Sequence, residues 1–218
     1  MEEDTKKLFE IGVNELPSHI PLFPLDNVLL LPFGKMPLNI FETRYVKMVL
    51  DSLKKQRLIG IVQPKDNSGE FFNIGCMGKI TSFIETPDNR IVLNLDGVCR
   101  FKITDSQLSQ GGYYNANVET IDFVEDINVV EPMIDRDSLI KKFANFFKIK
   151  KYDLDLNIIE ETSNLQLLST LTMLAPFNKI DKQAILEAQS EQEILEVLIS
   201  LLKMNLLGDN EKNDKTIN

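Results

Sequence analysis

IPLFPLDNVLLLPFGKMPLNIFETRY, residues 20–45, is the stretch that decides the fold of this 218-residue chain. The apolar runs Ile20–Phe23 and Val28–Leu31 predict two short strands. Pro24, Pro32 and Pro37 interrupt them, and proline cannot donate to a strand ladder. The stretch therefore predicts edge strands and bulges of a small, irregular sheet.

A helix is predicted to begin at the end of this stretch, between Phe41 and Gln56, because apolar residues recur there at three- and four-residue steps. Strand patterns follow the helix, with a hairpin predicted across residues 86–89. The predicted strands are Leu58–Val62, Gly75–Ile84, Arg90–Leu95, Val98–Ile103 and Tyr113–Phe123. The first dozen residues are compatible with a short polar helix that ends near Gly12.

Helical periodicity replaces the strand patterns from Asp135 onward. Helices are predicted around residues 139–147, over 163–174, from about residue 179, and from Ser190 to Gly208. Ser190 and Glu193 form a capping box at the start of the last helix. The apolar face of that helix is wide, so it either occupies the centre of the bundle, which we favour, or awaits a partner.

We therefore predict an α+β protein, with an all-β module that carries one inserted helix and is followed by a C-terminal α-helical bundle. The predicted layout is an N-terminal segment (1–14), a β domain (15–127), a helical bundle (128–207) and a disordered tail (208–218).

Composition limits the classes of partner and compartment. The net charge of −9 argues against nucleic acid, since phosphate binding needs clustered Lys and Arg. The acidic start, Met1-Glu2-Glu3-Asp4, lacks the basic and apolar regions of a secretory signal, and no apolar run approaches the length of a membrane helix. With only Cys76 and Cys99 present, we expect reduced, part-buried thiols and a cytoplasmic protein.

Catalytic and metal motifs are not found. His19 is the only histidine, and its place at a strand start favours a surface position over a catalytic one. Gly75-Cys76-Met77-Gly78-Lys79-Ile80 lacks the spacing of a phosphate-binding loop, because Asn73 and Ile80 stand where a glycine and a hydroxyl are needed. Gly75 and Gly78 are expected at a bend or bulge instead. We predict no catalytic residues, no cofactor and no metal, and hence no enzyme.

The order and spacing of several motifs resemble the Lon N-terminal domain. They begin with Ile20-Pro21-Leu22-Phe23-Pro24-Leu25 and continue through Val28, Pro32, Pro37-Leu38, Ile40-Phe41-Glu42 and Arg44-Tyr45. Further matches are Leu58-Ile59-Gly60, Ile74-Gly75-Cys76, Gly78, Ile80, Leu95, Gly97, Arg100-Phe101 and Ile103. The resemblance covers nearly the whole chain.

This resemblance implies a PUA-like barrel and a helical bundle, in a non-catalytic module that engages substrate proteins. It also implies a domain standing alone, without the ATPase and peptidase parts of a Lon protease. The expected partners are unfolded or substrate proteins. A full-length Lon-type protease is a further candidate partner, for which this protein would act as an adaptor in proteolysis or quality control. An RNA-binding PUA-like module is the alternative.

Phe33, Met36 and Tyr45 are the candidate protein-binding residues, because aromatic and Met side chains near proline-rich loops can accept varied apolar peptides. A purely structural role in the core is an equally good interpretation of the same residues. We also expect Glu42 and Arg44 to cap or pair locally.

Overall fold

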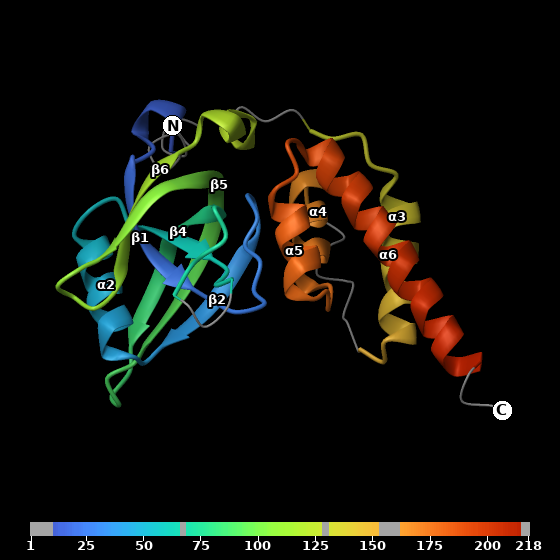
Figure 1. The fold of residues 1–218 in the computed structure, drawn as a ribbon, viewed down its shortest axis with the longest axis horizontal. Helices are drawn as coiled ribbons and strands as arrows, with labels where there is room; N and C mark the ends of the chain where they lie inside the picture. The colour runs from blue at the N-terminus through green and yellow to red at the C-terminus, as the bar shows by residue number, and fades with distance from the viewer. Residues whose placement is uncertain (1–10, 66–68, 128–130, 153–161, 215–218) are drawn as a thin grey trace.

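The protein is described by a computed structural model, which covers residues 11–65, 69–127, 131–152 and 162–214, with side chains up to residue 206. Two parts lie side by side, a barrel of strands and a group of helices (Figure 1). The strands are β1 (His19–Pro24), β2 (Lys35–Ile40), β3 (Leu58–Val62), β4 (Ile74–Glu85), β5 (Ile91–Leu108) and β6 (Tyr114–Glu119). The helices are η1 (Val13–Glu15), α2 (Thr43–Leu53), η2 (Ile121–Asp126), α3 (Arg136–Ile149), α4 (Asn164–Leu174), α5 (Lys179–Leu186) and α6 (Glu191–Asp214). The predicted α+β class is confirmed.

The barrel closes through β5, which is long enough to pair with three other strands. The strand order is β2-β5-β4-β3-β1-β6, and β6 also pairs with the far half of β5. β1 and β3 run parallel, whereas the other pairs are antiparallel. β2 remains outside the closed ring as an edge strand, where Pro37 costs no ladder hydrogen bond.

Gly75 and Gly78 lie where barrel strands approach closely, as predicted. A Cβ atom on Gly75 would lie 2.7 Å from the carbonyl oxygen of Ile61, and the β4–β5 register shifts between Met77 and Gly78. The hairpin turn across residues 86–89 is also confirmed, with Asn89 at a φ of 62°.

Three sequence expectations are wrong at the level of single elements. Residues 28–31 form an irregular loop and not a strand, and the second strand is β2. Asp96 and Gly97 do not separate two strands, because β5 runs through them over 18 residues. α6 does not end at Gly208 but continues to Asp214, through most of the tail that we expected to be disordered.

Other boundaries shift less. The last predicted strand is shorter, since β6 ends at Glu119 and the short helix η2 follows it. The short helix that we expected in the first dozen residues falls mostly on residues 1–10, outside the described residues. α2 begins at Thr43, and Arg44 Nη2 lies 2.7 Å from Glu42 Oε2, so the expected local pair is confirmed.

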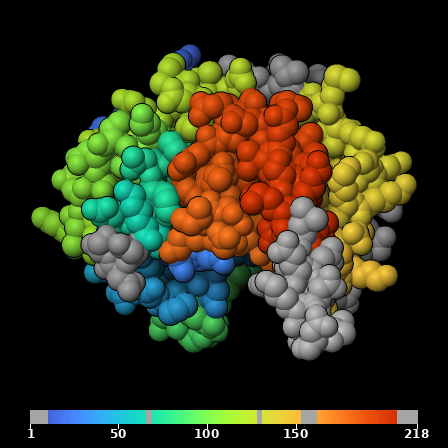
Figure 2. All heavy atoms as spheres, turned by 45° about the vertical axis from the view of Figure 1, so that its right-hand side comes forward, coloured from blue at the N-terminus to red at the C-terminus, as the bar shows by residue number. Residues whose placement is uncertain are grey.

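The helices pack around α6, whose inward side chains Ile194, Leu195, Leu198 and Leu202 are buried. The central position that we favoured for this helix is therefore confirmed. α6 crosses the bundle beside α3, α4 and α5, and the whole group packs against the barrel (Figures 1 and 2). One hydrophobic cluster runs without a break from the barrel into the bundle. Residue 127 therefore marks the change from strands to helices, and a domain boundary at this residue stays a prediction.

Candidate functional site

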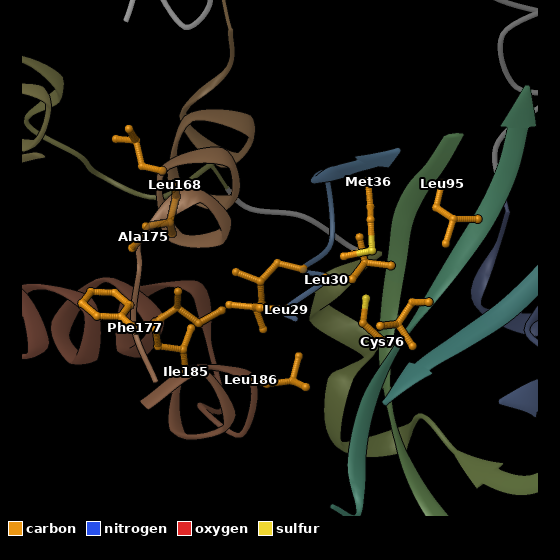
Figure 3. Close-up of a cluster of buried hydrophobic side chains, with 14 of the residues drawn as sticks. Leu29, Leu30, Met36, Cys76, Leu95, Leu168, Ala175, Phe177, Ile185 and Leu186 are labelled. Atoms are coloured by element: carbon orange, nitrogen blue, oxygen red, sulfur yellow. The ribbon is translucent and has the colours of Figure 1, made fainter. Parts of the chain in front are cut away.

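The loop from Leu25 to Gly34, which joins β1 to β2 and is called the proline loop below, fills the space between barrel and helices. Its side chains Leu29, Leu30 and Leu31 are buried. Leu29 and Leu30 lie between Phe177, Ile185 and Leu186 on the helical side and Met36, Cys76 and Leu95 on the barrel side (Figure 3). Burial on both sides explains why four consecutive apolar residues occur here without a strand.

Main-chain hydrogen bonds attach the proline loop to the barrel. The Leu25 amide donates to the Val62 carbonyl at 2.9 Å, and the Phe33 amide donates to the Gly97 carbonyl at 3.0 Å. The Gly97 amide in turn donates to the carbonyl of Gly34 at 2.8 Å. These bonds satisfy backbone groups that lie outside any ladder, so the loop is held in one conformation.

Side chains from the helices hold the other side of the same loop. Ser169 Oγ on α4 donates to the Pro32 carbonyl at 2.6 Å, and Lys182 Nζ on α5 donates to the Asn27 carbonyl at 2.8 Å. Lys179 and Asp26 form an ion pair beside them. The helical bundle thus positions the proline loop from residues far away in the sequence.

A pocket of about 520 Å³ opens between the proline loop, β2 and α4. The described residues that line it are Asn27, Val28, Leu29, Phe33, Lys35, Met36, Pro37, Thr162, Gln166, Thr170, Met173, Leu174 and Lys182. Apolar and Met side chains dominate the set, and Leu174 keeps 49% of its surface exposed at the wall. A concave, largely apolar site of this size can bury several side chains of a peptide.

Phe33 and Met36, two of the three candidate residues, both line this pocket. Phe33 has a φ of 63°, a left-handed conformation that bulky residues rarely adopt and that costs about 1–3 kcal/mol. The bond from its amide to Gly97 helps to hold it there. Met36 is 6% exposed and also packs into the core, so it supports the floor of the pocket.

Tyr45 lies elsewhere. Its ring stacks at a tilt on Phe23, with 4.5 Å between ring centroids, and the Arg44 guanidinium covers it at 4.6 Å. Only 8% of the residue is exposed, and burial raises the pKa of its hydroxyl above the ordinary value. The structure therefore places Tyr45 in the core beneath α2 and outside the lining of the pocket.

Sequence reasoning missed every lining residue that the helical bundle contributes. Met173, Leu174 and Lys182 line the pocket from α4 and α5. Helical periodicity contains one usable signal, since Lys182 falls among Gln183, Ile185 and Leu186 on the buried side of α5. No local pattern tells which element of the barrel that side faces.

Lys182 gives the pocket its electrostatic character. The residue is 8% exposed, and burial lowers the pKa of its ammonium group. Together with Lys35 it makes the lining positive, and none of the described lining residues is Asp or Glu.

A second hollow, of about 620 Å³, lies on the other side of Phe33. Arg57, Lys79, Asp96 and Asp126 contribute both charge signs to its lining. Lys79 has a lowered pKa because of burial and the neighbouring Arg57. The mixture of charges makes this hollow a weaker candidate for apolar segments than the first.

The residues considered for catalysis lie apart from both hollows. His19 is exposed at the start of β1, where its Nδ1 lies 3.0 Å from Ser18 Oγ, so the predicted surface position is confirmed. Cys76 and Cys99 are free and fully buried, and burial raises the pKa of both thiols, that of Cys99 to about 12. Within the described ranges, no three His, Cys, Asp or Glu side chains converge as a metal site would require.

Comparison with known proteins places the chain in a family. Residues 19–204 match the family model of the ATP-dependent protease La (LON) substrate-binding domain, and the chain belongs to that family. It is 25% identical over 199 residues to the Lon protease of Buchnera aphidicola subsp. Baizongia pistaciae, and 24% identical over 204 residues to that of Escherichia coli K12. Each alignment covers 86% of this chain and 25% of the relative, so the chain spans about a quarter of these proteases' length.

Solved structures show the same fold. The Lon N-terminal domain protein of Xanthomonas campestris superposes with a TM-score of 0.63 at 22% identity, over 84% of this chain and 98% of that one. The N-terminal domain of the Mycobacterium avium complex Lon protease gives 0.56 at 16% identity, over 85% and 98%. Among the described residues, no helix combines the length and apolar character needed to cross a membrane.

Proposed function

We propose that this protein is a non-catalytic module that recognises unfolded or substrate proteins through the pocket between the proline loop and α4. The observation that supports the proposal is the apolar pocket of about 520 Å³, whose walls come from both parts of the fold. Membership of the LON substrate-binding domain family supports the same class of function.

The pocket suits apolar segments of varied sequence. Met36 and Met173 are unbranched and adaptable, so they can reshape around different side chains. The rigid wall of the pocket is the proline loop with Phe33, because hydrogen bonds hold this loop from the barrel and from the helices. We further propose that the module acts in the cytoplasm as an adaptor in proteolysis or quality control, with a full-length Lon-type protease as one candidate partner.

Fluorescence anisotropy with a labelled, extended apolar peptide tests the proposal, and calorimetry with a chemically unfolded protein complements it. Leu174→Glu puts a charge into the apolar wall and is expected to weaken binding about tenfold. Ile180→Glu is the matched control, because Ile180 is also an exposed apolar residue on a helix but lies outside the pocket lining.

Three results count against the proposal: no binding at tens of micromolar, equal losses in the two variants, or salt-sensitive binding of RNA in place of peptide. The last result would favour the alternative of an RNA-binding module.

A further inference from the structure

Lys182 is a nearly buried cation in the wall of an apolar pocket. Its ammonium group carries three N–H donors, and the Asn27 carbonyl, 2.8 Å away, accepts one of them. Over the part of the chain that the structure describes, no carboxylate forms an ion pair with it, and burial is the cause of its lowered pKa. A charge in such a place is costly unless an opposite charge joins it.

The residues around Lys182 also carry more positive than negative charge. Lys35 adds a second positive charge to the lining, and none of the described lining residues is acidic. The nearby carboxylate of Asp26 already pairs with Lys179. The pocket is thus locally positive in a chain whose net charge is −9, so its charge is a property of the site and not of the surface as a whole.

We infer that the pocket takes an extended apolar segment of another protein with an Asp or Glu beside its apolar residues, and that Lys182 selects the carboxylate. This inference rests on the proposed function and adds a substrate class to it. The apolar residues of the segment would lie against Val28, Met36 and Leu174 while its carboxylate reaches the ammonium group. A hydrogen bond between two charged groups is stronger than a neutral hydrogen bond.

An internal acidic side chain fits the geometry better than a chain terminus. Terminal carboxylates are captured in nests of backbone N–H groups. Here the donor is a single side-chain ammonium on α5, and the neighbouring Phe33 and Gly97 amides are already bonded to carbonyls. A single point donor suits one side-chain carboxylate.

Labelled peptides that differ in one group test the inference with the intact chain. One pair has the same apolar core next to either Asp or Asn, with both C-termini amidated. A third peptide has Asn and a free C-terminal carboxylate. The Asp peptide is expected to bind about tenfold more tightly than the Asn peptide, the gain typical of a charge-assisted bond. The net charge of the chain opposes this preference, so general attraction cannot produce it.

Variants then assign the preference to a residue. Lys182→Met is expected to reduce the Asp-to-Asn affinity ratio to about one, since its unbranched chain keeps the stem and removes the charge. Lys203→Met is the control, because it removes the same charge from an exposed site on α6. Thermal unfolding of each variant shows whether it is folded, and the peptide comparison in the unmodified protein does not depend on any variant.

The outcomes separate the two ideas. Equal binding of the Asp and Asn peptides overturns the inference and leaves the proposed function standing, whereas no binding of any peptide overturns both. A preference only for the free C-terminus overturns the choice of an internal carboxylate. Loss of the preference in Lys35→Met, with retention in Lys182→Met, overturns the assignment to Lys182.

Discussion

Arg100 and Asp126 form a fully buried ion pair at the boundary between barrel and bundle, with Arg100 Nη2 2.7 Å from Asp126 Oδ1. Arg100 Nε donates to the same carboxylate at 3.0 Å, and the Arg100 amide donates to it at 2.7 Å. Its Nη1 donates to the Ala188 carbonyl between α5 and α6. One side chain on β5 therefore connects η2, the barrel and the helices.

Removing one member of this pair should destabilise the whole fold. Burial alone would lower the pKa of Arg100, but the hydrogen bonds and charge of Asp126 raise it, so Arg100 stays charged. Arg100→Met leaves the Asp126 charge buried without its partner, and we expect a loss of about 3–5 kcal/mol in the free energy of unfolding.

Urea denaturation measures this loss. Arg90→Met is the control, since Arg90 and Asp88 form an exposed pair, and it should change stability far less. The double variant Arg100→Met/Asp126→Leu should lose less stability than the sum of the losses in the two single variants, because no unpaired buried charge remains in it. A small loss in Arg100→Met would contradict the structural role assigned to this pair.

Gly97→Ala should be damaging although it adds one methyl group. A Cβ atom at Gly97 would overlap the carbonyl oxygen of Leu31, which is backbone and cannot rotate away. We expect a loss of about 1–3 kcal/mol or more, the cost of overpacking, together with displacement of the proline loop. Gly12→Ala is the control, because the nearest atom would be 3.6 Å away. Thermal unfolding compares the two, and similar stabilities would refute the close approach.

Substitutions of Phe33 and Tyr45 should have different effects, the first mainly on peptide binding and the second mainly on stability. Tyr45→Ala removes a buried ring that packs on Phe23, with an expected loss of about 3–5 kcal/mol in unfolding free energy. Phe33→Ala removes a half-buried ring at the pocket, so it should weaken peptide binding about tenfold.

The stability of Phe33→Ala should fall less than that of Tyr45→Ala, because its ring is only partly buried. Chemical denaturation and peptide anisotropy measured on both variants check this. Phe41→Ala is a control for the loss of an exposed aromatic ring, since Phe41 is 67% exposed. Tyr45→Ala losing affinity while keeping its stability would reverse the roles assigned here.

The buried thiols should make the fold less stable in alkaline solution. The pKa of Cys99 is raised to about 12 by burial and by the negative charge of Asp126, whereas the pKa of a thiol in the unfolded chain is about 8.5. Above that pH the unfolded state has released a proton that the folded state keeps, so stability falls as pH rises toward the folded pKa. The slope is about 1.4 kcal/mol per pH unit for each thiol.

Urea denaturation between about pH 9 and about pH 11 measures how steeply the free energy of unfolding falls with pH. Cys99→Ala should make that slope shallower by about 1.4 kcal/mol per pH unit, the contribution of one thiol. The thiols should also react with a disulfide reagent only as fast as the protein unfolds, since both are fully buried. Rapid reaction in the folded state would contradict their burial.

Sequence alone determined the elements whose cause is local. Helix α2 follows from apolar spacing, the start of α6 from Ser190 and Glu193, and the close approach at Gly75 from the absence of a side chain. In the structure, Ser190 Oγ accepts from the Glu193 amide at 3.2 Å, and a Cβ on Gly75 would lie 2.7 Å from Ile61 O. The family motifs likewise depend on order and spacing, which can be read without coordinates.

Tertiary structure alone decided what residues 28–31 become and where the pocket lies. An apolar run of four residues satisfies a strand or a doubly buried loop equally well. Here the loop conformation prevails because Val62 and Gly97 of the barrel form hydrogen bonds with its backbone, while α4 and α5 cover its side chains. Lys182 meets Asn27 across 155 positions of sequence, and such a contact is specified by the packing of the whole chain, since no local periodicity encodes it.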